Sequence, residues 1–243
     1  MSSLSSGPSI SCSDPSTGNT GKTRVSSASV ASPPRLVPDK RVVLPCVSWE
    51  TYERLLADDE ERRVPRITYD QGVLELVTPS TPHEEDALVF AHLVFIVAAN
   101  LGTPIRSVGS TTFRRKDLER GFEPDASFYI QNEERIRGKR QIDRTVDPPP
   151  DVVLEMEMTR SALDKLPLFA SMGIPEVWHC DGQRVTILIL EQDRYRESSN
   201  SLALPALTSD ILTRFLAESR TALSPNWFQA VSDWARGQRN AST

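Results

Sequence analysis

The segment at residues 151–158 (DVVLEMEM) constrains the fold of this chain more than any other stretch. A β-strand points successive side chains to opposite faces, so Val153, Glu155 and Glu157 share one face. The opposite face is continuously apolar and carries Val152, Leu154, Met156 and Met158. Carboxylates in the middle of an apolar strand cost free energy unless a cation compensates them. The segment therefore predicts a sheet strand that brings charge to a specific site.

A second acid, Asp125, stands at the mouth of an apolar strand at residues 126–130, and Lys165 follows the Glu155 strand on a predicted helix. Two converging carboxylates repel each other unless a divalent cation or a lysine lies between them, and oxygen ligands suit Mg²⁺ or Mn²⁺. Metal-assisted phosphodiester hydrolysis requires such a set, with acids for the metal and a lysine for the attacking water or the developing charge. Taken singly, each residue fits a solvent-exposed charge better; only the combination favours a site.

Turn and capping residues divide the remaining chain into short elements. Residues 70–72 (Asp-Gln-Gly) predict a hairpin turn. Thr81 as N-cap, Pro82 in the first turn and Glu84 as the capping-box acid predict a helix that runs to about Asn100. Further strands are expected at 107–113, 126–130, 152–158, 176–180 and 185–190, and further helices at 50–56, 161–172, 209–218 and 225–236. Strands flanked by helices predict an α/β or α+β domain with a central mixed sheet.

Composition separates a tail from this domain. Residues 1–38 are rich in serine and poor in large apolar side chains, so we expect them to be disordered, ahead of a domain at 39–220 and a C-terminal helix and tail at 221–243. Residues 18–23 resemble the end of a phosphate-binding loop. The first glycine of that motif is Ser16 here and no strand precedes it, so the motif is rejected.

The charge balance limits the classes of function. With 28 Lys and Arg against 33 Asp and Glu, the net charge of -5 argues against coating nucleic acid by bulk charge. No stretch approaches the roughly 18 apolar residues of a membrane span, so no membrane partner is expected. The three cysteines are far apart, which predicts no disulfide framework and favours a reducing, cytoplasmic location.

Basic residues flank the Asp125 strand on both sides and could contact phosphates. The candidates are Arg114, Arg115, Arg137, Lys139, Arg140 and, further along, Arg160. Glu133, Glu134 and Asp143 are interspersed, so a merely solvated loop is an equal alternative.

Residues 88–99 are apolar nearly all round the predicted helix. Such a helix packs deeply against a sheet or a partner, which leaves a homodimer open. His179-Cys180-Asp181 lacks a second Cys/His pair at ligand spacing, and we expect a strand end there rather than a zinc site.

Several segments together resemble the Uma2 family, formerly DUF820. They are the hairpin at 69–74, Thr78-Pro79-Ser80, His83-Glu84, Glu123-Pro124-Asp125, the PDVVLE run at 150–155 and the KLPLFASMGIPEVW run at 165–178. The last run resembles the family signature K-x-x-x-Y-x-x-x-G-V-x-E-Y-W and is the most specific. The similarity spans roughly residues 42–215.

This resemblance implies a restriction-endonuclease-like fold of the PD-(D/E)xK superfamily and Mg²⁺-dependent DNA cleavage. It implies that Asp125 and Glu155 are the motif acids and that Lys165 is the lysine, placed on the helix. Glu84 or Glu85 would complete the site from the preceding helix.

Two departures from the family pattern concern the metal site. Glu157 replaces the lysine of many superfamily members, and would add a metal ligand or weaken the site. Residues 158–161 (MTRS) replace the family's Ser-Pro-Ser-Thr and make Arg160 an additional phosphate contact.

Three functions follow as hypotheses. The leading one is a metal-dependent endonuclease that acts on DNA. The alternative is a degenerate nuclease-fold module that binds nucleic acid or a protein partner without turnover. A metal phosphodiesterase acting on nucleotides would differ only in its substrate.

Overall fold

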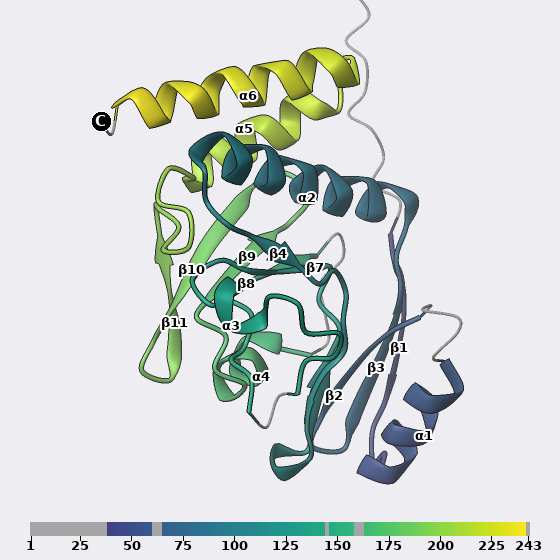
Figure 1. The fold of residues 1–243 in the computed structure, drawn as a ribbon. Helices are drawn as coiled ribbons and strands as arrows, with labels where there is room; N and C mark the ends of the chain where they lie inside the picture. The colour runs from purple at the N-terminus through teal and green to yellow at the C-terminus, as the bar shows by residue number, and fades with distance from the viewer. Residues whose placement is uncertain (1–37, 60–64, 144–145, 158–162, 242–243) are drawn as a thin grey trace, which may run out of the picture. The chain divides into compact units, whose positions relative to one another are not determined.

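The computed structural model describes residues 38–59, 65–143, 146–157 and 163–241. Over these residues the chain forms two β-sheets with helices packed against them (Figure 1). The serine-rich segment at 1–37 lies outside the described residues, so the disordered tail and the domain boundaries stay predictions. Within the described residues, no helix is long and apolar enough to cross a membrane.

One sheet is mixed, as predicted, and has six strands in the order β11-β10-β9-β8-β7-β4. Its strands β8 and β9 run parallel and are joined through helix α4 (Lys165–Ser171), whereas its other neighbours pair antiparallel. A parallel pair needs such a crossover connection. The strands are β4 (Arg106–Ser107), β7 (Ala126–Tyr129), β8 (Val152–Met156), β9 (Glu176–Cys180), β10 (Val185–Glu191) and β11 (Arg194–Ser198).

Both faces of β8 are buried, with the alternation that the sequence predicts. Val152, Leu154 and Met156 pack with Trp178 in the largest apolar cluster, on the side of the long helices. Val153 packs in a second cluster, with apolar residues of α4 among its members. Glu155 is therefore carried by a strand that packing holds on both sides.

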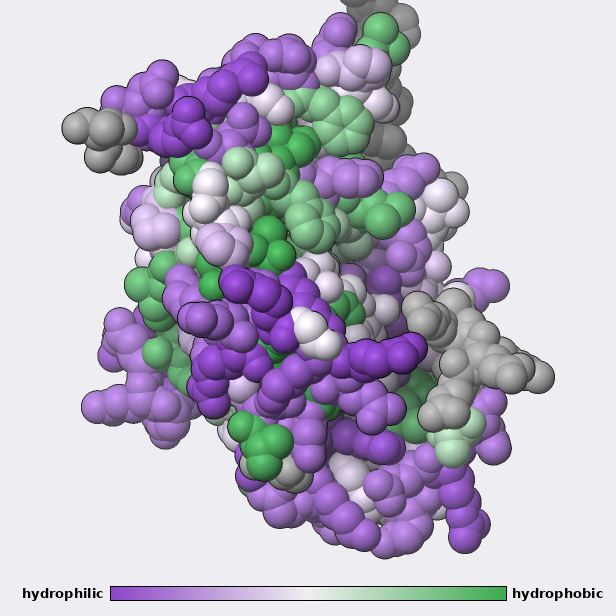
Figure 2. Space-filling view, viewed as in Figure 1, coloured by the Kyte–Doolittle hydropathy of each residue, from purple (hydrophilic) through white to green (hydrophobic). Residues whose placement is uncertain are grey.

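Two long helices pack against this sheet, and a third packs on those two helices (Figure 1). They are α2 (Thr81–Leu101), α5 (Ser209–Ser219) and α6 (Ser224–Ala241), with the short α3 (Glu133–Ile136) elsewhere in the domain. One side of α2 is buried, as expected, but Leu88 and Phe95 remain 59% and 42% exposed. Figure 2 shows hydrophobic side chains gathered over this region of α2. The homodimer stays a prediction.

The other sheet is antiparallel, in the order β1-β3-β2-β6-β5. Its predicted hairpin is confirmed, because Gln71 and Gly72 form a two-residue turn with φ of 46° and 97°. Helix α1 (Trp49–Asp59) packs on this sheet, where the Tyr52 ring stacks on Tyr69 at 4.9 Å. The strands are β1 (Lys40–Leu44), β2 (Arg66–Asp70), β3 (Val73–Thr78), β5 (Phe113–Arg115) and β6 (Arg120–Phe122), with a 3-10 turn η1 (Lys116–Leu118) between the last two.

Two expected elements differ from the structure. The strand expected at 107–113 is wrong: the chain leaves the mixed sheet after β4 and joins the antiparallel sheet at β5. Gly109, with φ of 59°, lies in the turn between these strands, where it changes the direction of the chain. The helix expected from residue 161 begins at Lys165, with Asp164 as its N-cap. Residues 158–162 lie outside the described part of the chain.

Candidate active site

The pairing of β7 with β8 brings the two predicted acids together. Ala126 pairs with Leu154 in an antiparallel register, so Asp125, just before β7, lies beside the end of β8 that carries Glu155. The Asp125 amide donates to the Leu154 carbonyl at 3.1 Å and extends the ladder by one step. The Met156 amide donates to Asp125 Oδ2 at 2.5 Å. The register therefore sets the separation of the two acids.

Asp125 is almost fully buried and is surrounded by donors. Its Oδ1 forms an ion pair with Arg66 Nη1 and lies 2.7 Å from His83 Nε2. With Oδ2 bound to a backbone amide, both carboxylate oxygens have protein partners. Such a set of donors replaces the water that a buried carboxylate loses.

His83 connects Asp125 to a second buried acid, Asp39. The His83 Nδ1 atom lies 3.0 Å from Asp39 Oδ2, and the Ser80 amide donates to Asp39 Oδ1 at 2.8 Å. Burial raises the pKa of Asp39, but the hydrogen bonds from His83 and Ser80 outweigh burial and the net pKa is lowered. The imidazole thus bridges two carboxylates that come from different parts of the chain.

The start of α2 differs from the predicted capping box. Ser80, not Thr81, is the N-cap, and its side chain makes no capping bond. Glu84 does not reach back to the N-cap, because its carboxylate accepts from Arg66 Nη2 at 2.8 Å. Arg66 therefore bridges Asp125 and Glu84, and this competition explains why the capping prediction is wrong. Glu84 lies at the edge of the site and Glu85 is exposed on α2.

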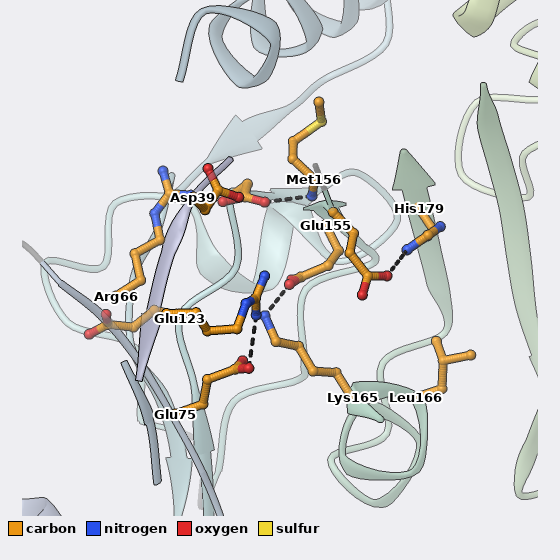
Figure 3. Close-up of polar contacts among 12 residues, drawn as sticks. Asp39, Arg66, Glu75, Glu123, Glu155, Met156, Lys165, Leu166 and His179 are labelled. Carbon is orange, nitrogen blue, oxygen red and sulfur yellow. Dashed lines mark hydrogen bonds and ion pairs between the residues drawn. The ribbon is translucent and has the colours of Figure 1, made fainter. Parts of the chain in front are cut away.

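Lys165 occupies the position that the sequence predicts. It is the first residue of α4, where the Asp164 carboxylate caps the helix by accepting from the Leu166 amide at 3.2 Å. Its ammonium group forms an ion pair with Glu155, and both side chains are 13% exposed. Figure 3 shows the lysine reaching from α4 to the Glu155 carboxylate. The predicted set of Asp125, Glu155 and Lys165 therefore lines one small cavity.

Glu157 points away from Asp125. Its Oε2 lies 2.7 Å from His179 Nε2, on the neighbouring strand β9. The hydrogen bond to Glu157 raises the pKa of His179 against the opposing effect of burial. Glu157 and His179 line a larger cavity with Glu155, which connects this pair to the site.

Two further acids near the site have structural partners. Glu123 accepts from the Ile67 amide at 2.9 Å and from the Thr112 hydroxyl at 2.6 Å. Glu75 is fully buried and pairs with Arg41 at 2.8 Å. Glu123 and Lys165 line the same small cavity, and Figure 3 shows the Glu75 carboxylate below the Lys165 head group. Arg41 lines this small cavity as well, so its lining carries both positive and negative charge.

Most of the proposed phosphate-binding residues pair with local acids. Arg115 donates to Asp117 at 2.8 Å, Arg137 pairs with Glu133, and Lys139 with Asp147. Arg114 lies 4.0 Å from Glu53, and Arg140 is exposed. Arg160 lies outside the described residues. Their role in nucleic-acid binding stays a prediction.

The strand end expected at His179-Cys180-Asp181 is confirmed, because these residues form the end of β9 and the turn after it. Trp178, on the same strand, is fully buried. Burial raises the pKa of the Cys180 thiol to about 12, so this thiol stays protonated at neutral pH.

The donor atoms fit a hard divalent cation. Asp125 and Glu155 offer only oxygens, and Mg²⁺ is commonly held by one or two carboxylates together with water and substrate phosphate. Among the described residues, no three His, Cys, Asp or Glu side chains group as a complete metal cage. A cation at Asp125 would have to replace Arg66, which now neutralises that carboxylate.

The mixed sheet, its βαβ unit and the packed helices define an α+β domain. The Uma2 family model, described as "Putative restriction endonuclease", matches residues 49–221. This match covers well over half of the sequence, and the chain belongs to the Uma2 family.

Comparison with solved structures finds a protein of similar description. It is a crystal structure of "a putative nuclease belonging to DUF820" from Anabaena variabilis ATCC 29413, with 15% sequence identity and a TM-score of 0.47. The match covers 70% of this chain and 99% of that chain. None of the curated proteins matches.

Proposed function

We propose that this protein is a metal-dependent endonuclease that hydrolyses DNA phosphodiester bonds. Its proposed catalytic site consists of Asp125, Glu155 and Lys165. One observation carries the proposal: strand β8, helix α4 and the residue just before β7 bring two carboxylates and an ammonium group to a single cavity. Membership of the Uma2 family, whose description is "Putative restriction endonuclease", supports the same reaction class.

Each residue has a distinct part in the reaction. The Asp125 and Glu155 carboxylates would hold Mg²⁺ or Mn²⁺, and such an ion supplies an acidified water and charge stabilisation when bound. Lys165 now donates to Glu155 and has the reach to contact a phosphate oxygen, where its charge opposes the charge that develops on phosphorus. Arg66 keeps Asp125 neutralised in the absence of the cation.

Plasmid nicking by the purified full chain in Mg²⁺ or Mn²⁺ tests this proposal. We expect Asp125→Ala and Glu155→Ala to lower the nicking rate by about 100-fold or more, because each removes a metal ligand. Glu197→Ala, which removes an exposed carboxylate paired with Arg184, is the matched control and should keep full activity. Equal nicking by the wild type and both site variants would refute the assignment. Mononucleotide diesters in a parallel arm distinguish a nucleotide phosphodiesterase.

The second candidate is a degenerate module without turnover, and one observation favours it. Both acids of the proposed site already pair with protein cations, Asp125 with Arg66 and Glu155 with Lys165. Calorimetric titration with Mn²⁺ separates the candidates. The endonuclease binds Mn²⁺ in a manner that Glu155→Ala abolishes, whereas the degenerate module shows no carboxylate-dependent binding.

We also propose secondary roles for residues around this centre. Glu84 and Glu157 would act at its margins, and DNA phosphates would contact Arg114, Arg115, Arg137, Lys139, Arg140 and Arg160. A cytoplasmic location accords with the wide cysteine spacing in the sequence.

A further inference from the structure

A cavity of about 600 Å³ adjoins the acid–lysine site, between α4 and the strands β8, β9 and β10. One part of its lining is apolar and consists of Leu163, Leu166, Phe169, Val177 and Leu188. The polar part comprises Glu155, Glu157, Asp164, Lys165 and His179. Figure 3 shows Leu166 and His179 on facing sides of the space beside Lys165. This cavity thus has apolar walls and a charged rim.

The cavity is continuous with the proposed reaction centre. Glu155 and Lys165 line both this cavity and the small one that contains Asp125. A phosphate at the acids and the lysine would therefore place its neighbouring nucleoside at the entrance of the larger cavity.

We propose that this cavity is a subsite for one unpaired nucleobase next to the scissile phosphate, an inference that rests on the proposed phosphodiester hydrolysis. The substrate class is then nucleic acid with an unpaired base at the cleavage position. Single strands, mismatches and damaged bases meet this requirement at the least cost, because a paired base must first leave its stack.

The chemistry of the lining favours a base over the other parts of a nucleotide. A base has two apolar faces and a polar edge, and its faces pack well against aliphatic and aromatic side chains. Leu166 and Leu188 are only partly buried and offer such surfaces, and the His179–Glu157 pair lies where a polar edge can meet it. A sugar or a phosphate would leave the apolar walls without a matching partner.

The charge on the rim also separates a base from a second phosphate. Glu155 and Glu157 both reach this cavity, and Asp164 lies at its margin as the cap of α4. Three carboxylates against Lys165 and His179 disfavour an additional anion there. A neutral group suits the cavity better.

Fluorescence titration of the full chain with a single-stranded oligonucleotide that carries one 2-aminopurine tests the subsite, in EDTA so that no turnover occurs. We expect a saturable fluorescence change, and Leu166→Trp, which fills the cavity, should weaken binding by about tenfold or more. Leu188→Phe fills the cavity from the opposite wall and serves where the first variant fails to fold. Leu223→Trp is the matched control, because Leu223 is 73% exposed and does not line the cavity.

Nicking of single-stranded, mismatched and fully paired DNA by the same variants separates the two proposals. Cleavage that prefers unpaired DNA and falls with Leu166→Trp supports the subsite. If Leu166→Trp and the control Leu223→Trp cleave all three substrates at the same rate, the subsite is overturned and the endonuclease proposal still stands. Oligonucleotide binding that depends on Leu166 without cleavage in any metal supports the subsite and overturns turnover. If the protein neither binds the oligonucleotide nor cleaves DNA, both the subsite and the endonuclease are overturned.

Discussion

The two ends of the charged cluster differ in their access to solvent. At one end, His83 and Asp125 are 3% and 4% exposed, and Arg66 and Asp39 complete their hydrogen bonds. At the other end, Glu157 and His179 are 25% and 31% exposed and face the larger cavity. Glu155 and Lys165 lie between these ends and line both cavities. The first end is built to hold a carboxylate in one orientation, and the second is open to a ligand.

The difference has a physical origin in desolvation. A buried charge costs several kcal/mol unless partners replace its water, so the Asp125 end requires a complete set of donors. An exposed pair keeps part of its hydration and contributes much less. Loss of one partner should therefore have unequal effects at the two ends.

The largest expected effect comes from breaking the buried end. Asp125→Ala leaves Arg66 and His83 without their shared carboxylate and should lower the free energy of unfolding by about 3–5 kcal/mol. Glu157→Ala, at the open end, should cost about 1 kcal/mol or less. Urea denaturation of both variants measures the difference. Similar losses at the two sites would show that the ends are equivalent.

A second prediction concerns Arg66 as a competitor of the metal. Arg66→Gln frees Asp125 and should raise the Mn²⁺ affinity by about tenfold, measured by calorimetry. Glu84→Gln should lower the Mn²⁺ affinity, because among the described residues Asp125 is then the one carboxylate left to pair with Arg66. In the double variant the Glu84 effect should vanish.

This double-mutant cycle also tests whether Glu84 is itself a ligand. A direct ligand would still cost affinity when Arg66 is absent, so a loss that persists in the double variant contradicts the role of Glu84 as the partner of Arg66. The binding measurement is independent of catalytic activity.

The smallest expected effect is the pH dependence of the open end. The pKa of His179 is raised above its ordinary value of 6.5, chiefly by Glu157. The pair of protonated His179 with Glu157 therefore stabilises the folded state fully below pH 6.5. This stabilisation is lost as the pH rises through the higher pKa of His179 in the folded state. The difference in free energy of unfolding between the wild type and Glu157→Gln should therefore become smaller as the pH rises through this window. A difference independent of pH would contradict the pairing, and His179→Gln in both backgrounds is the control.

The acids and the lysine were predictable because their signals are local. Period-two alternation places Glu155 opposite the apolar face of β8, and the short connection to α4 limits how far Lys165 can lie from it. Asp125 adjoins an apolar strand, and a strand of this kind has to pair within the sheet. The two strands are antiparallel neighbours, which brings the acids together.

The partners of Asp125 were not predictable in this way. Arg66 and His83 are 59 and 42 positions from Asp125 in the sequence, and Asp39 lies on the segment before β1. None interrupts an apolar run, so nothing in the local pattern distinguishes them from surface residues. The His83-Glu84 pair at the helix start is the available signal, but the pattern predicts only Glu84 as a site residue.

The sequence by itself determined the strand that carries Glu155, the hairpin at Gln71-Gly72 and the long apolar helix, because alternation, turn chemistry and a continuous apolar run act over a few residues. Tertiary structure alone decided that residues 107–113 divide between two sheets, that Arg66 takes Glu84 from its capping role, and that His83 joins two buried acids. These outcomes depend on which distant segments become neighbours. A buried charge is then stable only where a partner replaces the hydration that it has lost.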